Sequence, residues 1–314
     1  MRTHFLFLSV LLAVAIVTST ARADGLPVLT ESGPTGLVSA NGAARYATLK
    51  EAGGTVVLRV ARDEGRVFAS GFLHGDFAIP VVAYDGSPGG LSADGSTLVL
   101  LRPRTTFPRT KTPFAILDAK SLRVRSVTTL RGDFSFDALS PDGSTLYFIE
   151  YLSPDDPAEY AVRAFDTRAG ELVREPIVDR TEPDEDMGGN PLSRETSPDG
   201  RWAYTLYDGA GSAPFVHALD TVEREAHCID LDALAGRGDL PDLRLRLSNG
   251  SLAVVSPRQR VVVIDTASFQ VGEASRGSSA GTKGPWPAIG VLVALLAATA
   301  VSLIIRRRRR LSPV

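Results

Sequence analysis

The sequence predicts an all-β protein, a β-propeller of about five four-stranded blades followed by one C-terminal transmembrane helix. Three observations support this prediction. A turn containing glycine recurs about every fifty residues, an aspartate that closes a strand recurs with the same period, and a run of 20 uncharged, largely apolar residues stands near the C-terminus.

Residues 1–23 have the features of a cleaved secretory signal peptide. Arg2 supplies the positive charge, Phe5–Val17 is apolar except for Ser9, and Ala21-Arg22-Ala23 fits an A-x-A cleavage site. An uncleaved membrane anchor is the alternative, and it is disfavoured because the apolar run is short and a small-residue site follows it. The ectodomain is therefore expected over residues 24–274.

The first repeated landmark of the ectodomain is a polar turn that ends in glycine. Asp-Gly and Asn-Gly favour tight hairpins, because glycine accepts positive φ and the carboxylate or amide bonds the turn backbone. A strand-like run follows each turn, and the glycines are 53, 48, 57 and 50 residues apart. The turns are Asn41-Gly42, Ser92–Gly95, Ser140–Gly143, Ser197–Gly200 and Ser248–Gly250.

The second landmark is an aspartate after the next strand-like run, where its carboxylate can bond a following turn. These aspartates are 55, 48, 54 and 45 residues apart, at Asp63, Asp118, Asp166, Asp220 and Asp265. Each unit therefore reads strand, glycine turn, strand, loop, strand, aspartate turn, strand. We expect Leu26–Thr30 to add an outer strand to the weak fifth unit.

A four-stranded unit cannot bury both faces alone, whereas radial stacking of such units as a β-propeller does. A β-sandwich is the alternative, but it does not predict the repeated aspartate spacing. The run Ser140-Pro141-Asp142-Gly143 before an aromatic strand, and Val262-Val263-Ile264-Asp265-Thr266, resemble bacterial surface β-propellers of the YVTN and TolB-like kind, within the WD-repeat-like superfamily. This resemblance implies an architecture, and it implies no particular activity.

The composition limits the partners of the ectodomain. Residues 24–275 hold 25 basic and 36 acidic residues, a balance of −11. Such a surface repels nucleic acids, so a nucleic-acid partner is not expected. The single cysteine, Cys228, excludes an intramolecular disulfide and fits a buried strand residue.

The loops predict a functional face. In a propeller the glycine and aspartate turns share one face, and the loops between middle strands and between blades share the other. The second set is long and varied here, which is typical of binding loops. On this long-loop face the candidate partner residues are Arg102, Arg104, Arg109, Asp155, Asp156, Asp184, Glu185 and Asp186. Solvated charged loops without a ligand are the alternative interpretation.

A central channel would be lined by the residues that precede the glycine turns. The candidates there are Asp137, Glu195, Arg194 and Arg244. Two acids without a histidine make a poor metal site, and the acidic loop Thr181–Asp186 lacks the spacing of a calcium-binding loop. The sequence also offers no set of a nucleophile and a general base at a catalytic spacing. No catalytic residue, metal or cofactor is therefore predicted.

The C-terminal segments predict a single-pass membrane anchor. After a linker at residues 275–285, Trp286–Ile305 is 20 residues without charge, enough for a helix of roughly 30 Å. Arg306–Arg310 follows, and positive charge beside a span favours the cytoplasmic side. The ectodomain is then extracytoplasmic, and residues 306–314 form a cytoplasmic basic tail.

These features predict a membrane-anchored binding or scaffolding module for a protein, peptide or glycan. A secreted propeller hydrolase of the lactonase kind is one alternative. An accessory subunit of an envelope or transport complex, reached through the membrane helix, is another.

Overall fold

The computed structural model describes residues 30–31, 33–182 and 187–273. The chain divides into two units, Met1–Gly272 and Glu273–Val314, and all the features below belong to the first unit apart from the last residue of its final strand. The predicted signal peptide, linker, membrane helix and basic tail lie outside the described residues. Within the described ranges, no helix is long and apolar enough to cross a membrane.

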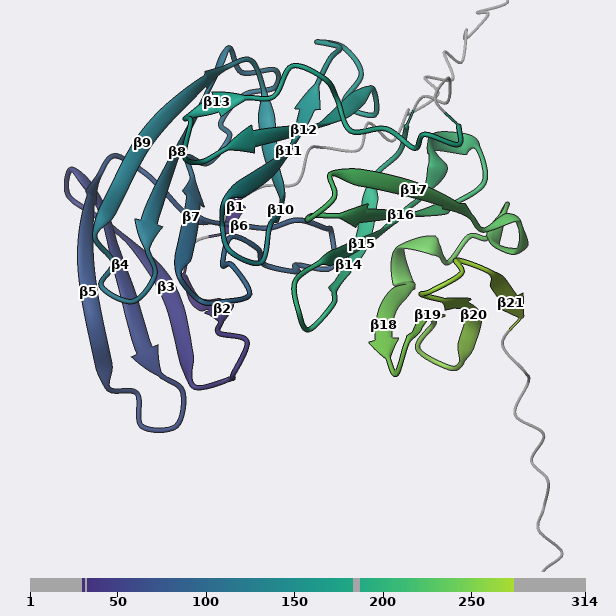
Figure 1. Cartoon of the computed structure of the whole chain (residues 1–314), viewed down its shortest axis with the longest axis horizontal. Coiled ribbons are helices and arrows are strands. Elements are labelled where there is room, and N and C mark those ends of the chain that lie inside the picture. Colours follow the sequence, from purple (N-terminus) through teal and green to yellow (C-terminus); the bar gives the residue numbers. More distant parts are fainter. Residues whose placement is uncertain (1–29, 32, 183–186, 274–314) are drawn as a thin grey trace, which may run out of the picture. The chain divides into compact units, whose positions relative to one another are not determined.

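The described chain is an all-β succession of antiparallel sheets, as the repeats predict, and each sheet of three or four strands is called a blade here (Figure 1). Short 3₁₀ turns, η1 (Gly209–Gly211), η2 (Asp232–Leu234) and η3 (Leu240–Asp242), are the helical elements of the described part. Blade one holds β2 (Gly33–Val38), β3 (Ala44–Glu51), β4 (Gly54–Ala61) and β5 (Val67–His74); blade two holds β7 (Thr97–Leu101), β8 (Lys111–Asp118) and β9 (Val124–Arg131); blade three holds β10 (Phe134–Leu139), β11 (Thr145–Tyr151), β12 (Tyr160–Asp166) and β13 (Glu171–Leu172); blade four holds β14 (Pro191–Thr196), β15 (Trp202–Tyr207), β16 (Phe215–Asp220) and β17 (Glu225–Asp230); blade five holds β18 (Arg244–Ser248), β19 (Ser251–Val255), β20 (Arg260–Asp265) and β21 (Val271–Glu273).

Blade two is three-stranded because an irregular segment takes the place of its first strand. The Val99 amide donates to the Gly90 carbonyl at 2.7 Å, and the Ser92 amide donates to the Thr97 carbonyl at 3.0 Å. Gly90 has a φ of +103°, and a Cβ there would lie 2.5 Å from the Val99 carbonyl oxygen. This close approach requires glycine and prevents a regular strand.

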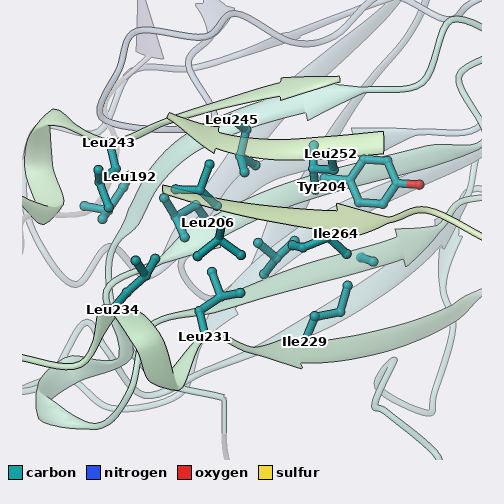
Figure 2. Close-up of a cluster of buried hydrophobic side chains, with 14 residues drawn as sticks. Leu192, Tyr204, Leu206, Ile229, Leu231, Leu234, Leu243, Leu245, Leu252 and Ile264 are labelled. Atoms are coloured by element: carbon teal, nitrogen blue, oxygen red, sulfur yellow. The ribbon is translucent and has the colours of Figure 1, made fainter. Parts of the chain in front are cut away.

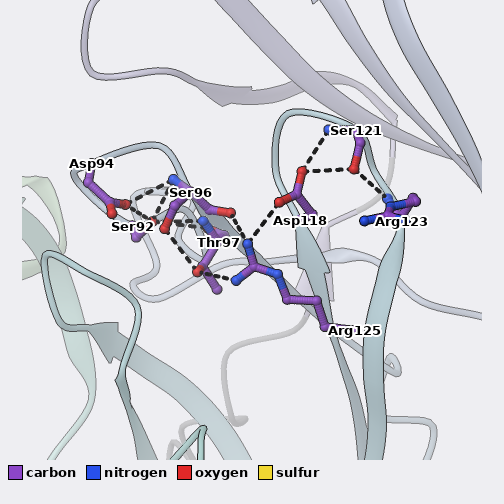
Figure 3. A network of polar contacts seen from close by, with 8 residues as sticks. All are labelled: Ser92, Asp94, Ser96, Thr97, Asp118, Ser121, Arg123 and Arg125. Carbon is purple, nitrogen blue, oxygen red and sulfur yellow. Dashed lines mark hydrogen bonds and ion pairs between the residues drawn. The ribbon is translucent and has the colours of Figure 1, made fainter.

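The glycine and aspartate turns lie together at one end of each blade, as predicted. The five turn glycines all have φ between +66° and +76°. In blade two the Asp118 carboxylate accepts from the Ser121 amide at 2.9 Å, which closes the aspartate turn (Figure 3). Arg125 then donates to Asp118 at 2.9 Å and to the Ser96 carbonyl of the glycine turn at 3.0 Å, so one guanidinium joins both turns.

Two details differ from the sequence prediction. Strand β4 ends at Ala61, so Asp63 does not close it; the Asp63 carboxylate bonds the Glu64 amide beyond the strand. Thr30 does not pair with blade five but lies in β1 (Thr30–Glu31), opposite Pro80 of β6 (Ile79–Pro80). Its partner β6 leads into blade two, and blade five takes its outer strand from β21, while residues 26–29 lie outside the described part.

Apolar side chains from successive blades form the core. Separate clusters join blades one and two, two and three, three and four, and four and five. In the last of these, Leu206 packs among Leu245, Leu252 and Ile264, all 0% exposed (Figure 2). Each fully buried leucine contributes about 1.5–3 kcal/mol. Among the described residues no such cluster contains side chains of both blade five and blade one.

Candidate functional site: an inner cavity above a buried ion pair

The connection from blade one to blade two contains a hairpin at residues 81–88 that reaches blade four. The Val82 amide donates to the Ser87 carbonyl at 2.9 Å and closes the hairpin. At its tip the Tyr84 amide donates to the Pro191 carbonyl at 2.9 Å, and the Tyr84 hydroxyl donates to Asn190 at 3.0 Å. Hairpin 81–88 therefore fastens the entrance of blade two to the first strand of blade four.

A cavity of about 360 Å³, called the inner cavity here, is lined by residues of blades one to four and of hairpin 81–88. Its buried lining comes from the hairpin and from all four blades, and includes Val82, Phe136, Asp137, Leu139 and Ala203. Its exposed lining is Val38, Ala40, Pro88, Thr196 and Pro198. Exposed residues of blades one and four, together with Pro88, therefore form the rim of the cavity, and buried side chains of the hairpin and of blades three and four form much of its floor.

An ion pair between blades three and four belongs to this lining. Arg194 of β14 donates from Nη2 to Asp137 Oδ1, and the two side chains are 6% and 2% exposed. Asp137 reaches this position because a bulge interrupts the pairing of β10 with β11 between Phe136 and Ala138. The other carboxylate oxygen of Asp137 and Nε of Arg194 are buried and have no hydrogen-bond partner among the described residues.

A polar row crosses blade four behind Arg194. Arg194 lies opposite Thr205, and Thr205 lies opposite His217 of β16. The His217 ring is 1% exposed, and its Nε2 has no hydrogen-bond partner in the described part of the chain. Burial lowers the pKa of His217 to about 4, although the negative charge of Asp137 opposes this shift. The imidazole is therefore neutral at pH 7.

The structure brings two of the four predicted channel residues to this lining. Asp137 and Arg194 line the inner cavity, whereas Glu195 and Arg244 are absent from its lining. Adjacent strand residues face opposite sides, so Glu195 lies on the other face from Arg194 and approaches Arg246 of blade five at 3.5 Å. Burial raises the pKa of Glu195, and Arg246 opposes that shift. Arg244 donates to the carbonyls of Pro241 and Leu243.

The three loop arginines of blade two do not form one exposed group, contrary to the expectation from sequence. Arg104 and Arg109 are 5% and 11% exposed, and both pair with Asp133, which is 2% exposed. Arg104 Nη2 lies 2.5 Å from Asp133 Oδ1, and the Arg109 amide donates to Asp133 Oδ2 at 2.9 Å. Burial, followed by the charge of Arg104, lowers the pKa of Arg109 to about 10. Arg102 is exposed, with its guanidinium 5.5 Å from the Phe77 ring centroid.

The acidic residues of the predicted face are divided by the limits of the described part. Asp155 and Asp156 are exposed in the loop between β11 and β12. Asp184, Glu185 and Asp186 lie outside the described residues. Within the described ranges, no group of three or more His, Cys, Asp or Glu side chains is placed to hold a metal ion.

Sequence reasoning missed three contributors to this region. Hairpin 81–88 was not predicted, although Asp85-Gly86 and Gly89-Gly90 are turn signals. Asp133 gave no signal, since it follows a glycine in a short connection. His217 was not among the candidate site residues, because it stands in a strand-like run without a second histidine at a metal-ligand spacing.

The repeated four-stranded antiparallel sheets place the chain in the β-propeller class. No family model matches the sequence, and no curated protein matches it. Among solved structures the chain is similar to a putative TolB from Agrobacterium tumefaciens, with 16% identity and a TM-score of 0.41 over 79% of this chain and 80% of that one. It is also similar to hydrazine synthase of Kuenenia stuttgartiensis (14% identity, TM-score 0.44, 76% and 70% covered). A third similar structure is the Dos1 propeller, with 12% identity and a TM-score of 0.44 over 77% of this chain and 58% of that one. At these identities the similarity concerns the fold alone.

Proposed function

We propose that this chain is a membrane-anchored, extracytoplasmic β-propeller that binds a protein, peptide or glycan ligand and receives part of it in the inner cavity. The observation that carries the proposal is the cavity itself. It measures about 360 Å³ and is lined by apolar side chains, by several hydroxyl groups and by one buried ion pair. Binding sites commonly have this composition, in which apolar area supplies affinity and a few polar groups fix orientation.

The position of the cavity changes which part of the molecule we favour for binding. Turn residues such as Ala40 and Pro198 stand at its rim, whereas two of the three loop arginines are committed to Asp133. Arg102, Asp155 and Asp156 are exposed, and they remain our candidates for additional partner contacts on the long-loop face.

Site-specific photo-crosslinking tests this function in the full-length chain in its native membrane. A photoreactive residue replaces Ala40 at the cavity rim or, as a matched control, Ser248. Both positions are exposed and precede a turn glycine by two residues, but only Ala40 lines the cavity. We expect a discrete adduct, identified by mass spectrometry, from position 40 and none from position 248.

Two results would contradict the proposal. Adducts from a photoreactive residue at Asp156, with none at position 40, would place binding on the long-loop face. Turnover of a lactone or ester by the purified full-length chain would replace the binding module with the hydrolase alternative.

A further inference from the structure

The ion pair of the inner cavity indicates which charge a ligand should carry. Asp137 and Arg194 carry opposite charges, so together they are neutral, and both are nearly fully buried. A charged ligand group would have to displace one member of the pair and leave the other without its counter-ion. Leaving a buried charge uncompensated is strongly unfavourable. An uncharged ligand leaves the pair intact.

The same pair has one unused acceptor and one unused donor. Asp137 Oδ2 and Arg194 Nε are buried, belong to lining residues, and have no hydrogen-bond partner in the described part of the chain. Buried polar atoms without partners are uncommon, and each one costs free energy. An amide group supplies the complementary set, because its N–H can donate to the carboxylate and its carbonyl can accept from the guanidinium.

The walls of the cavity indicate the rest of the ligand. Leu37, Val82, Leu91, Phe136 and Leu139 contribute apolar side chains to the lining. A volume of about 360 Å³ lies at the lower end of the roughly 300–1,000 Å³ typical of small-molecule sites. One apolar group with an adjoining amide is a ligand of suitable size.

We propose that the inner cavity binds an uncharged amide, with its amide group on the Asp137–Arg194 pair and an apolar body against the walls formed by blades one to three. Asp137 Oδ2 and Arg194 Nε lie just beneath the cavity surface, so binding involves a small local adjustment of the two side chains that keeps their ion pair. The proposal rests on the function proposed above and specifies its ligand chemistry.

Four probes of similar size separate charge from hydrogen bonding. They are N-methylcyclohexanecarboxamide, its ester analogue methyl cyclohexanecarboxylate, the cyclohexanecarboxylate anion and the cyclohexylmethylammonium cation. Each is titrated against the full-length chain in lipid nanodiscs and followed by ligand-observed NMR. We expect the amide to bind about tenfold more tightly than the ester, since the ester lacks the donor for Asp137, and to exceed both ions by at least as much.

A pair of tryptophan variants separates the cavity from the lipid and the surface. Ala40→Trp adds bulk at the rim, whereas Ser248→Trp adds it at the equivalent exposed turn position of blade five, outside the cavity. Amide binding should be lost in Ala40→Trp and kept in Ser248→Trp.

The outcomes distinguish the two levels of the proposal. If Ala40→Trp abolishes binding but an ion binds more tightly than the amide, or the amide and the ester bind equally, the amide assignment is wrong. The cavity then remains a binding site for another kind of ligand. If Ala40→Trp and Ser248→Trp bind the amide equally, the inner cavity is not the ligand site, and the proposed function is refuted as well. A high-resolution structure with ordered water on Asp137 Oδ2 in the presence of saturating amide likewise overturns the amide assignment.

Discussion

Replacing Arg104 with glutamine should destabilise the fold, although Arg104 stands in a loop. Its guanidinium is 5% exposed and donates to Asp133 from Nε at 3.0 Å and from Nη2 at 2.5 Å. It also lies 4.9 Å from the Tyr151 ring centroid. Arg104→Gln removes one of the two positive charges that compensate the buried Asp133 carboxylate. The matched variant Arg102→Gln removes an exposed guanidinium from the same loop.

The size of the effect follows from burial. Removing one partner of a buried pair costs about 3–5 kcal/mol, and the lower end applies here because Arg109 stays beside Asp133. About 3 kcal/mol corresponds to a fall in Tm of about 6–12 °C for a domain of this size. Arg102→Gln loses an exposed cation–π contact and should cost less than about 1 kcal/mol.

Thermal denaturation of the purified full-length variants, followed by circular dichroism, measures both changes. The double variant Arg104→Gln, Asp133→Asn should lose less stability than the sum of the two single variants, because each single change already removes their shared interaction. A Tm for Arg104→Gln within about 2 °C of the parent chain would refute the assignment of Arg104 to the buried network.

Gly143→Val should lower stability by roughly 1 kcal/mol or more in urea denaturation, because φ is +71° and a Cβ would lie 2.4 Å from Thr97 Oγ1; Gly95→Val, with no neighbour within 4 Å, should cost less, and equal costs would contradict this packing. Because burial lowers the pKa of His217 to about 4, its contribution to the free energy of unfolding is complete above about pH 6.5 and decreases as the pH falls toward 4, by up to about 3 kcal/mol. His217→Gln should flatten this pH dependence, and an unchanged slope in that variant would count against the buried neutral imidazole. Protease added to intact cells should remove the ectodomain and leave a small anchored fragment, whereas full protection until lysis would reverse the predicted topology.

Local signals predicted the repeats well. The turn at Gly143 and the aspartate turn at Asp118 depend on residues within a few positions of each other, so the sequence alone specifies them. The prediction for Asp63 was wrong, because its spacing matches that of the other strand-closing aspartates although β4 ends earlier, at Ala61. The irregular first segment of blade two depends on the contact of Gly90 with Val99, which no alternation of apolar residues reveals.

The candidate site was less predictable because its contacts are remote in sequence. Asp137 and Arg194 were proposed as channel residues from their place before a turn, but their pairing joins positions 57 residues apart. Arg104 and Asp133 are 29 residues apart, and the charge of the loop gave no sign that its guanidinium would be buried. The pairing of these charges depends on how neighbouring blades pack, and short patterns in the sequence do not reveal that packing.

Hairpin 81–88 has a consequence for how this chain can evolve. In a simple array of repeats each unit contacts its neighbours, so a unit can be duplicated or deleted with limited disturbance. Here Tyr84 bonds Asn190 across 106 positions, and blades two and three are encoded between them. Adding or removing a repeat in that interval would move β14, whose Pro191 carbonyl accepts from the Tyr84 amide, away from the hairpin. The number of blades between these two points is therefore fixed, whereas blade five, encoded after the acceptor, is not subject to this constraint.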